Sequence, residues 1–162
     1  FSKVHKIPGS AWQKMTSTVR WCNLIIRTDI SSQRKYSMTH KIAWVQPNFQ
    51  QGPKELNAHY LPYSAGVIWS YAIADPWIKN NFEVTEWVWR RDAVEPLAQQ
   101  LAQNDIVTFS TYVWNHRYNY EVARRVKELN PNVLTIFGGP EPAITDPELF
   151  VKEPFIDILP VI

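Results

Sequence analysis

Residues that could bind a ligand directly follow two apolar runs of the sequence: hydroxyl-bearing residues after one run, and a glycine pair with a proline after the other. They are Ser110, Thr111 and Tyr112 after the run 105–109, and Gly138, Gly139 and Pro140 after the run 133–137. Both runs combine β-branched and aromatic residues and are bounded by turn formers, which predicts strands buried on both faces. A hydroxyl pair after one strand and a glycine pair after the other are the kinds of group that border a ligand site.

The segment between the two runs predicts how they are placed. Residues 116–130 have the pattern of a helix that ends at Asn130-Pro131. A strand, a helix and a strand at this spacing predict a right-handed crossover and therefore a parallel sheet. Ligands of such sheets lie at the carboxyl ends of the strands, near a topological switch point. We therefore expect the residues 110–112 and 138–140, here called the ligand rim, to face one ligand.

The same alternation of strands and helices extends over most of the chain. Strands are expected at 41–47, 82–89, 105–109, 133–137 and 156–159, and helices at 65–74 with a short continuation to 79, 93–103, 116–130 and 147–152. We expect Phe82, Val84, Glu86 and Val88 on one side of their strand, and Asp92 and Asp146 as helix caps. The pattern predicts an α/β fold: a flavodoxin-like (Rossmann-like), doubly wound, parallel five-stranded sheet with helices on both faces.

Composition narrows the classes of function. The chain has 162 residues, 45% of them hydrophobic, which suffices for one domain with a core. A net charge of +2 does not favour nucleic acid or an anionic membrane as partner. Eight Trp residues are expected mainly in the core and in interfaces. Cys22 is the single cysteine, which fits a reducing, cytoplasmic setting, and neither a membrane-spanning run nor a signal peptide is recognised.

The two ends suggest a fragment of a longer protein. Residues 1–37 show no clean strand or helix period, and Met38 directly precedes the first predicted strand. We expect 1–37 to be an N-terminal extension, either non-native sequence upstream of Met38 or a native segment that packs on the domain. Residues 38–162 are expected to form an α/β domain truncated within its last strand.

The sequence lacks the motifs that bind several common ligands of this fold. The first strand ends in Val45-Gln46-Pro47-Asn48, without the acidic residues of a phosphoacceptor domain. The loop after it has one glycine, Gly52, up to residue 60, so a G-x-G-x-x-G nicotinamide motif is absent. A Ser/Thr-rich flavin phosphate loop and a P-loop are absent as well.

The remaining pattern resembles the cobalamin-binding domain, and more specifically the N-terminal cobalamin-binding module of radical S-adenosylmethionine (SAM) enzymes. The resemblance rests on the order and spacing of KIAWVQPN at 41–48, LPYSAG at 61–66, DIVTFS at 105–110 and IFGGPE at 136–141. It implies that the loop after the first strand, beginning at Asn48, together with Ser110 and the Gly138-Gly139 pair, surrounds the lower face and nucleotide tail of cobalamin. Thr111, Tyr112, Pro140 and Glu141 are the further cofactor-binding candidates.

The resemblance also implies partners that this chain does not contain. In the family, cobalamin carries a methyl group, while a downstream barrel of the same polypeptide holds an iron–sulfur cluster and SAM. That barrel needs C-x-x-x-C-x-x-C, and Cys22 alone cannot supply it. The chain is therefore expected to be a binding module of a methyltransferase, or of a relative with ring or carbon-skeleton chemistry, rather than a catalyst by itself.

One departure concerns the lower cobalt ligand. The methionine-synthase type of domain has D-x-H-x-x-G after the first strand, and here the nearest sequence runs from Asn57 through His59 to Pro62. His59 is the candidate cobalt ligand, but the carboxylate that usually orients a metal-bound His is replaced by Asn57. His116, at the start of a helix, is expected to be a solvated first-turn residue.

Other interpretations stay open at this point. Ser110 and Thr111 could cap a turn, and the glycine pair could form an ordinary strand-to-helix turn. Tyr63, Tyr112 and Trp114 either wall the ligand site or face a missing domain. Arg90-Arg91 and Arg124-Arg125 are expected on solvated faces, and Glu141 is either a ligand contact or solvated. The alternative functions are a cofactor-free docking or substrate-recognition domain and a stand-alone glycan- or nucleotide-binding domain.

Overall fold

The structure, a computed structural model, describes residues 39–141, 146 and 148–160. The expected extension 1–37 and Cys22 lie outside these residues. The elements are β1 His40–Val45, β2 Gln50–Gln51, η2 Lys54–Leu56, β3 Ala58–His59, α2 Tyr63–Ala72, α3 Pro76–Asn81, β4 Phe82–Val88, α4 Val94–Leu101, β5 Ile106–Ser110, α5 His116–Leu129, β6 Leu134–Gly138 and α6 Leu149–Lys152. Within this described part, no helix has the length and apolar character that crossing a membrane requires.

Four parallel strands form the main sheet in the order β4-β1-β5-β6. The chain runs from β1 outward to β4 on one side and then returns to add β5 and β6 on the other, which is the flavodoxin-like winding that the sequence predicts. The expected fifth strand is represented by one parallel bridge, between Ile136 and Ile158, and not by a full strand. The topological switch point lies where β1 and β5 meet.

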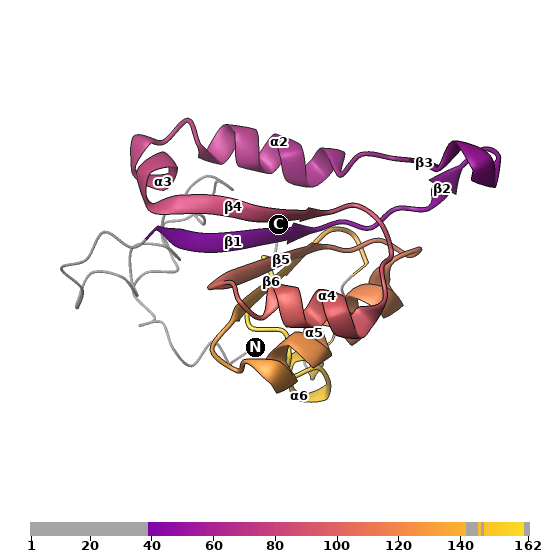
Figure 1. Ribbon diagram of the computed structural model, residues 1–162. Coiled ribbons are helices and arrows are strands. Elements are labelled where there is room, and N and C mark those ends of the chain that lie inside the picture. The colour runs from indigo at the N-terminus through magenta and orange to yellow at the C-terminus, as the bar shows by residue number, and fades with distance from the viewer. Residues whose placement is uncertain (1–38, 142–145, 147, 161–162) are drawn as a thin grey trace. The chain divides into compact units, whose positions relative to one another are not determined.

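Helices cover both faces of the sheet, as the doubly wound prediction requires (Figure 1). On one face, α4 and α5 bury Leu97, Leu101, Val122 and Val126 against the strands, all at 5% exposure or less. On the other face, α2 packs Ala65 and Trp69 against β1, β4 and β5. The core is therefore divided by the sheet, and its larger part lies beneath α4 and α5.

A β-bulge corrects the predicted alternation of β4. The register between β1 and β4 shifts between Ile42 and Ala43, so that Ile42 pairs with Val84 while Ala43 pairs with Glu86. The extra residue inverts the sides beyond it. Val84 consequently packs on the α2 face and Val88 in the cluster beneath α4. The prediction that Phe82, Val84, Glu86 and Val88 share one side was wrong.

Helix ends differ from the expected caps. Ala93 and not Asp92 occupies the N-cap of α4, without a side-chain hydrogen bond. The last helix, α6, begins at Leu149 and not at 147, and Asp146 accepts a hydrogen bond from the Glu148 amide (2.9 Å) in the turn before it. Asp75 is the N-cap of α3, and its carboxylate accepts a hydrogen bond from the Trp77 amide.

The loop between β1 and α2 contains a small antiparallel pair, β2 with β3, that the sequence pattern did not predict. This hairpin projects beyond the carboxyl end of β1 (Figure 1). Strands of two residues are too short to show the alternation of apolar and polar residues from which strands are predicted. The loop thus brings its own short sheet to the end of the molecule where ligands are expected.

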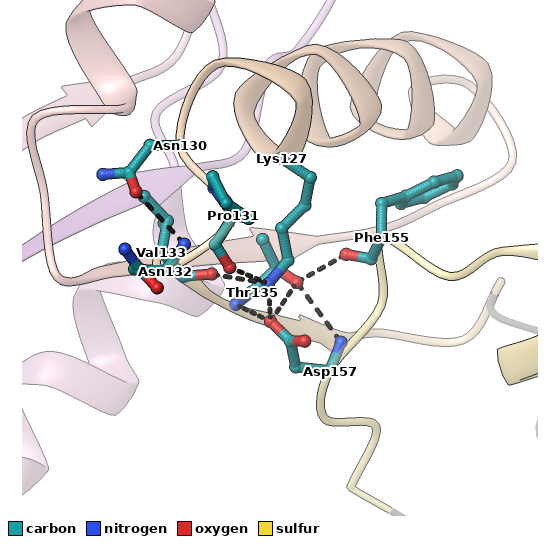
Figure 2. Close-up of polar contacts among 8 residues, drawn as sticks. All are labelled: Lys127, Asn130, Pro131, Asn132, Val133, Thr135, Phe155 and Asp157. Carbon is teal, nitrogen blue, oxygen red and sulfur yellow. Dashed lines mark hydrogen bonds and ion pairs between the residues drawn. The ribbon is translucent and has the colours of Figure 1, made fainter.

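A polar cluster fastens the segment after α6 to β6 (Figure 2). Asp157 Oδ2 lies 2.6 Å from Lys127 Nζ and accepts a hydrogen bond from the Thr135 amide (2.8 Å). The Thr135 hydroxyl lies 2.5 Å from the Phe155 carbonyl and 2.9 Å from Asp157 Oδ2, and its single proton can be donated to only one of them. Lys127 also donates to the Val133 carbonyl (2.7 Å). These contacts hold the segment where the fifth strand was expected.

Candidate functional site

The structure brings the two halves of the ligand rim together. Ser110 and Gly138 are the last residues of β5 and β6 and are direct partners in the parallel register. Immediately beyond them, the Thr111 amide donates to the Gly138 carbonyl (2.7 Å), and the Glu141 amide donates to the Thr111 carbonyl (3.3 Å). The turns after the two strands are therefore joined backbone to backbone at the carboxyl end of the sheet.

Gly138 faces open space. A Cβ built on Gly138 meets no atom within 4 Å. Its partner Ser110 is half-buried, and none of the described residues hydrogen-bonds its hydroxyl group. An unused hydroxyl beside an unfilled volume is the arrangement that the expected role in ligand binding needs.

Gly139 has a different role. Its φ is +105°, a conformation that side chains rarely adopt, and a Cβ there would stand 2.3 Å from the Thr111 carbonyl oxygen. Close approach of the neighbouring turn, rather than of a ligand, thus requires glycine at this position. The two glycines of the pair are therefore separable: Gly139 shapes the turn, and Gly138 leaves space beside it.

Two asparagines that the sequence analysis missed fix the turn after β5. Asn115, 1% exposed, donates to the Pro47 and Ser110 carbonyls (both 3.1 Å) and accepts from the Tyr112 amide (2.8 Å). Asn119, fully buried, donates to the Ser110 carbonyl and lies 3.2 Å from the Thr111 hydroxyl. Their spacing of four residues at the start of a predicted helix was the available signal, since such residues share one face.

The Thr111 hydroxyl is buried within the protein. Tyr112, the next residue, instead contacts the start of α2. Tyr112 and Ser64, at the start of α2, join their hydroxyl groups at 2.7 Å. Gln46, 5% exposed, accepts from the Ala65 amide (3.1 Å) and so satisfies a free N–H in the first turn of α2. Sequence reasoning missed Gln46 and Ser64 because their partners lie far away along the chain.

Asn48 holds the long loop in place. Its amide group donates to the Tyr60 and Leu61 carbonyls (3.1 and 3.3 Å), and its oxygen accepts from the Trp114 indole (3.4 Å). Trp114 in turn stacks on Tyr112, with ring centroids 4.7 Å apart. The residue that the family resemblance marks as a cofactor contact is 6% exposed. Its side-chain amide group and oxygen both form hydrogen bonds within the protein, and these bonds hold the loop.

Aromatic surface gathers at the same end of the sheet. Phe49 contacts both Tyr60 and Trp114 edge to face, with centroids 5.3 and 6.1 Å apart. These three rings are between 42% and 50% exposed, and the Tyr63 ring is 78% exposed. Tyr63 and Trp114, both expected either to wall the site or to meet another domain, thus present apolar surface beside the switch point.

Pro140 and Glu141 directly follow the glycine pair in the chain. Pro140 is exposed and Glu141 is half-buried. Glu141 Oε1 lies 3.7 Å from His116 Nδ1, the same ring nitrogen that is 3.0 Å from the Val113 carbonyl. His116 is half-buried at the start of α5, and it is therefore less solvated than expected.

His59 lies at a different place from the ligand rim. It ends β3, its Nδ1 lies 3.2 Å from the Asn57 carbonyl, and its ring meets Trp89 edge to face with centroids 5.4 Å apart. The described residues contain no group of three or more His, Cys, Asp or Glu side chains that could hold a metal ion. Cobalt ligation by His59 stays a prediction.

His59 instead borders a hollow of about 410 Å³ next to the carboxyl ends of β1 and β4. The lining residues are Asn48, Phe49, Gln50, Asn57, His59, Arg90, Arg91 and Asp92. None of the residues from 110–112 or 138–141 lines it. The ligand rim and this hollow are thus two separate features of one end of the sheet.

Burial changes the acidity of one tyrosine near this hollow. The Tyr118 hydroxyl donates to the Asp92 carbonyl (2.8 Å). Burial, with a smaller contribution from the Asp92 charge, raises the pKa of Tyr118 to about 12. The raised pKa extends to higher pH the range over which Tyr118 keeps the proton that binds the Asp92 carbonyl.

Comparison with known proteins gives two relevant relatives, while no protein-family model matches the chain. The chain is 35% identical over 100 residues to 2-(S-pantetheinyl)-carbapenam-3-carboxylate methyltransferase of Streptantibioticus cattleyicolor. It is 36% identical over 100 residues to the cobalamin-dependent radical SAM methyltransferase TokK of Streptomyces tokunonensis. Each match covers 62% of this chain but 15% of the relative. The chain is thus similar to a small part of much longer methyltransferases.

Proposed function

We propose that this chain is the cobalamin-binding module of a cytoplasmic radical SAM enzyme, a methyltransferase or a close relative. Two independent lines support the proposal. The relatives are methyltransferases, and the name of TokK includes cobalamin and radical SAM chemistry. The fold has the strand order of sheets that bind ligands at a switch point, and the expected hydroxyl and glycine residues meet at the carboxyl ends of β5 and β6.

The single observation that carries the proposal is the pairing of Ser110 with Gly138. An unfilled volume beside Gly138 and an unused hydroxyl on Ser110 fit a bulky ligand with a hydrogen-bonding ring nitrogen, as the cobalamin tail has. Ser110 would donate to that tail, and Gly138 would leave room for it. Tyr112, Pro140 and Glu141 would border the corrin, while Gly139 and Thr111 would support the turns.

Bound cobalamin would supply a cobalt centre that carries a methyl group. The protein's own part is to hold and shield: the Tyr112–Trp114 stack and the loop fixed by Asn48 would exclude water from one edge of the cofactor. The iron–sulfur cluster and SAM would belong to a barrel elsewhere in the same polypeptide. The chain's single cysteine cannot hold such a cluster.

Titration with hydroxocobalamin, read by visible absorbance, tests this function. We expect Gly138→Val to weaken binding at least about tenfold, because the added methyl groups occupy the space beside Ser110. Ser110→Ala should weaken it by about 1 kcal/mol, the value of one hydrogen bond. Gly66→Ala is the matched control, since a Cβ at Gly66 on α2 also meets nothing within 4 Å. Equal affinity of Gly138→Val and wild type would exclude this ligand position.

A cofactor-free docking domain is the second candidate, and one observation favours it. Tyr112 and Trp114 already bond to Ser64 and Asn48 of the same chain, so side chains of the protein bridge part of the carboxyl edge. A folded chain that takes up no corrin, but binds the rest of the enzyme through the exposed Tyr63 and Phe49 rings, would support this alternative.

A further inference from the structure

The hollow between the β2–β3 hairpin and the end of β4 has the chemistry of an anion site. At about 410 Å³ it falls in the lower range of small-molecule pockets, but charged and amide side chains make up most of its lining. Arg90 and Arg91 supply two guanidinium groups against the one carboxylate of Asp92. A pocket with a surplus of guanidinium groups favours an oxyanion ligand.

The arginines of this hollow differ from the arginine pair on α5. Arg124 and Arg125 form ion pairs with carboxylates, Arg125 with Glu95 at 2.6 Å and Arg124 with Glu153 at 3.5 Å. Neither Arg90 nor Arg91 has a carboxylate partner among the described residues. Both pairs were expected on solvated faces, and Arg90, Arg91 and Arg124 are indeed exposed. The two pairs differ in their carboxylate partners.

The contacts that Arg90 and Arg91 do make orient them without neutralising their charge. The Arg90 guanidinium lies over the Trp89 ring, 4.6 Å from its centroid. Arg91 donates to the Trp114 carbonyl. Because a guanidinium has five N–H donors, both side chains keep donors for a ligand. The segment itself is anchored by the Tyr118–Asp92 hydrogen bond.

We infer that this hollow binds a phosphate group through Arg90 and Arg91. The inference does not rest on the cobalamin proposal, because Arg90 and Arg91 are not among the residues that the proposal uses. Two sources of phosphate fit the chemistry: the phosphodiester in the nucleotide loop of cobalamin, and a separate phosphorylated compound. Both would meet the same two guanidinium groups.

The test uses the full chain and inorganic phosphate as probe, at constant ionic strength, with calorimetry and the arginine Nε–H signals in NMR as readouts. We expect Arg90→Gln with Arg91→Gln to weaken phosphate binding at least about tenfold. Arg124→Gln with Arg125→Gln, which removes the same charge, should leave it within about twofold. Arg90→Gln alone, at an exposed side chain, gives a second variant that keeps the fold.

Phosphate binding that is absent, unchanged by the Arg90 and Arg91 substitutions, or lost equally in the α5 control would overturn the inference. Corrinoids then identify the source, because cobinamide lacks the nucleotide loop and its phosphate. Weaker binding of hydroxocobalamin but not of cobinamide in the double variant assigns the site to the cofactor. Unchanged binding of both, with phosphate binding lost, assigns it to a separate phosphorylated compound. The phosphate titration needs no corrinoid, so its result is independent of the proposed function.

Discussion

At the scale of single residues, the two adjacent glycines have opposite requirements. Gly138 faces empty space in an ordinary strand conformation, whereas Gly139 has a positive φ and touches the Thr111 backbone. The sequence shows only a Gly-Gly pair, so it predicts the pair as a unit. The separation arises from backbone torsion and from a turn 28 residues away, neither of which a local pattern encodes.

This difference predicts opposite changes in stability. Gly138→Ala should raise the free energy of unfolding by about 0.5 kcal/mol, because it restricts the unfolded chain without a clash. Gly139→Ala should lower it by about 2 kcal/mol or more, from the strained φ and the contact with Thr111. Urea unfolding of both variants measures this, and equal effects would contradict the separate roles.

The raised pKa of Tyr118 predicts that the folded protein loses stability at high pH. Its pKa of about 12 in the folded protein exceeds the ordinary value of 10.0, chiefly because the side chain is partly buried. The folded state therefore keeps a proton that the unfolded state releases, so stability falls as pH rises from about 10 to 12. The free energy of unfolding should fall more steeply over this range in the wild type than in Tyr118→Phe. Parallel pH profiles would show that the burial of Tyr118 does not matter.

At the scale of elements, the sequence predicted the strands and helices well where apolar periodicity decides. The four strands of the sheet lie where they are expected, and α4 and α5 form within the ranges expected to be helical. Periodicity failed at the bulge in β4, where one extra residue exchanges the two faces. On α2, the apolar residues Val67, Ile68 and Tyr71 are exposed by 49% to 62%, while Ala65 is buried.

The candidate site was predicted less completely than the fold. Ser110 and Gly138 could be paired from strand order alone, since both end neighbouring parallel strands. Gln46 and Ser64 were missed, because each acts through a hydrogen bond to a residue from another part of the chain. A single sequence carries no local signal for such partners.

The segment after α6 depends on the Lys127–Asp157 cluster for its place beside β6. Asp157→Ala should lower the free energy of unfolding by about 2 kcal/mol, because it removes the carboxylate that pairs with the partly buried Lys127 and leaves the Thr135 amide without its acceptor. Glu148→Gln, at an exposed ion pair with Lys152, is the control and should change it by less than about 0.5 kcal/mol. Similar values for the two variants in urea unfolding would argue against a special role of Asp157.

At the scale of the whole molecule, the carboxyl end of the sheet carries three kinds of surface. The rim around Ser110 and Gly138 leaves space, and the aromatic residues Phe49 and Trp114 are partly exposed. The hollow at Arg90 contains two guanidinium groups that have no carboxylate partner among the described residues. Their gathering at one end is what the proposed binding of a large, partly apolar cofactor requires. The match covers 15% of each relative, so most of each relative's length lies outside the matched part.

The measurement that tests this account most directly is the amount of hydroxocobalamin that the chain retains after desalting, read as corrin absorbance per mole of protein. The account predicts near-stoichiometric retention by the wild type and by Gly66→Ala, and loss of retention in Gly138→Val with circular dichroism unchanged. A folded wild-type chain that emerges colourless, or a Gly138→Val variant that retains as much corrin as the wild type, would contradict it.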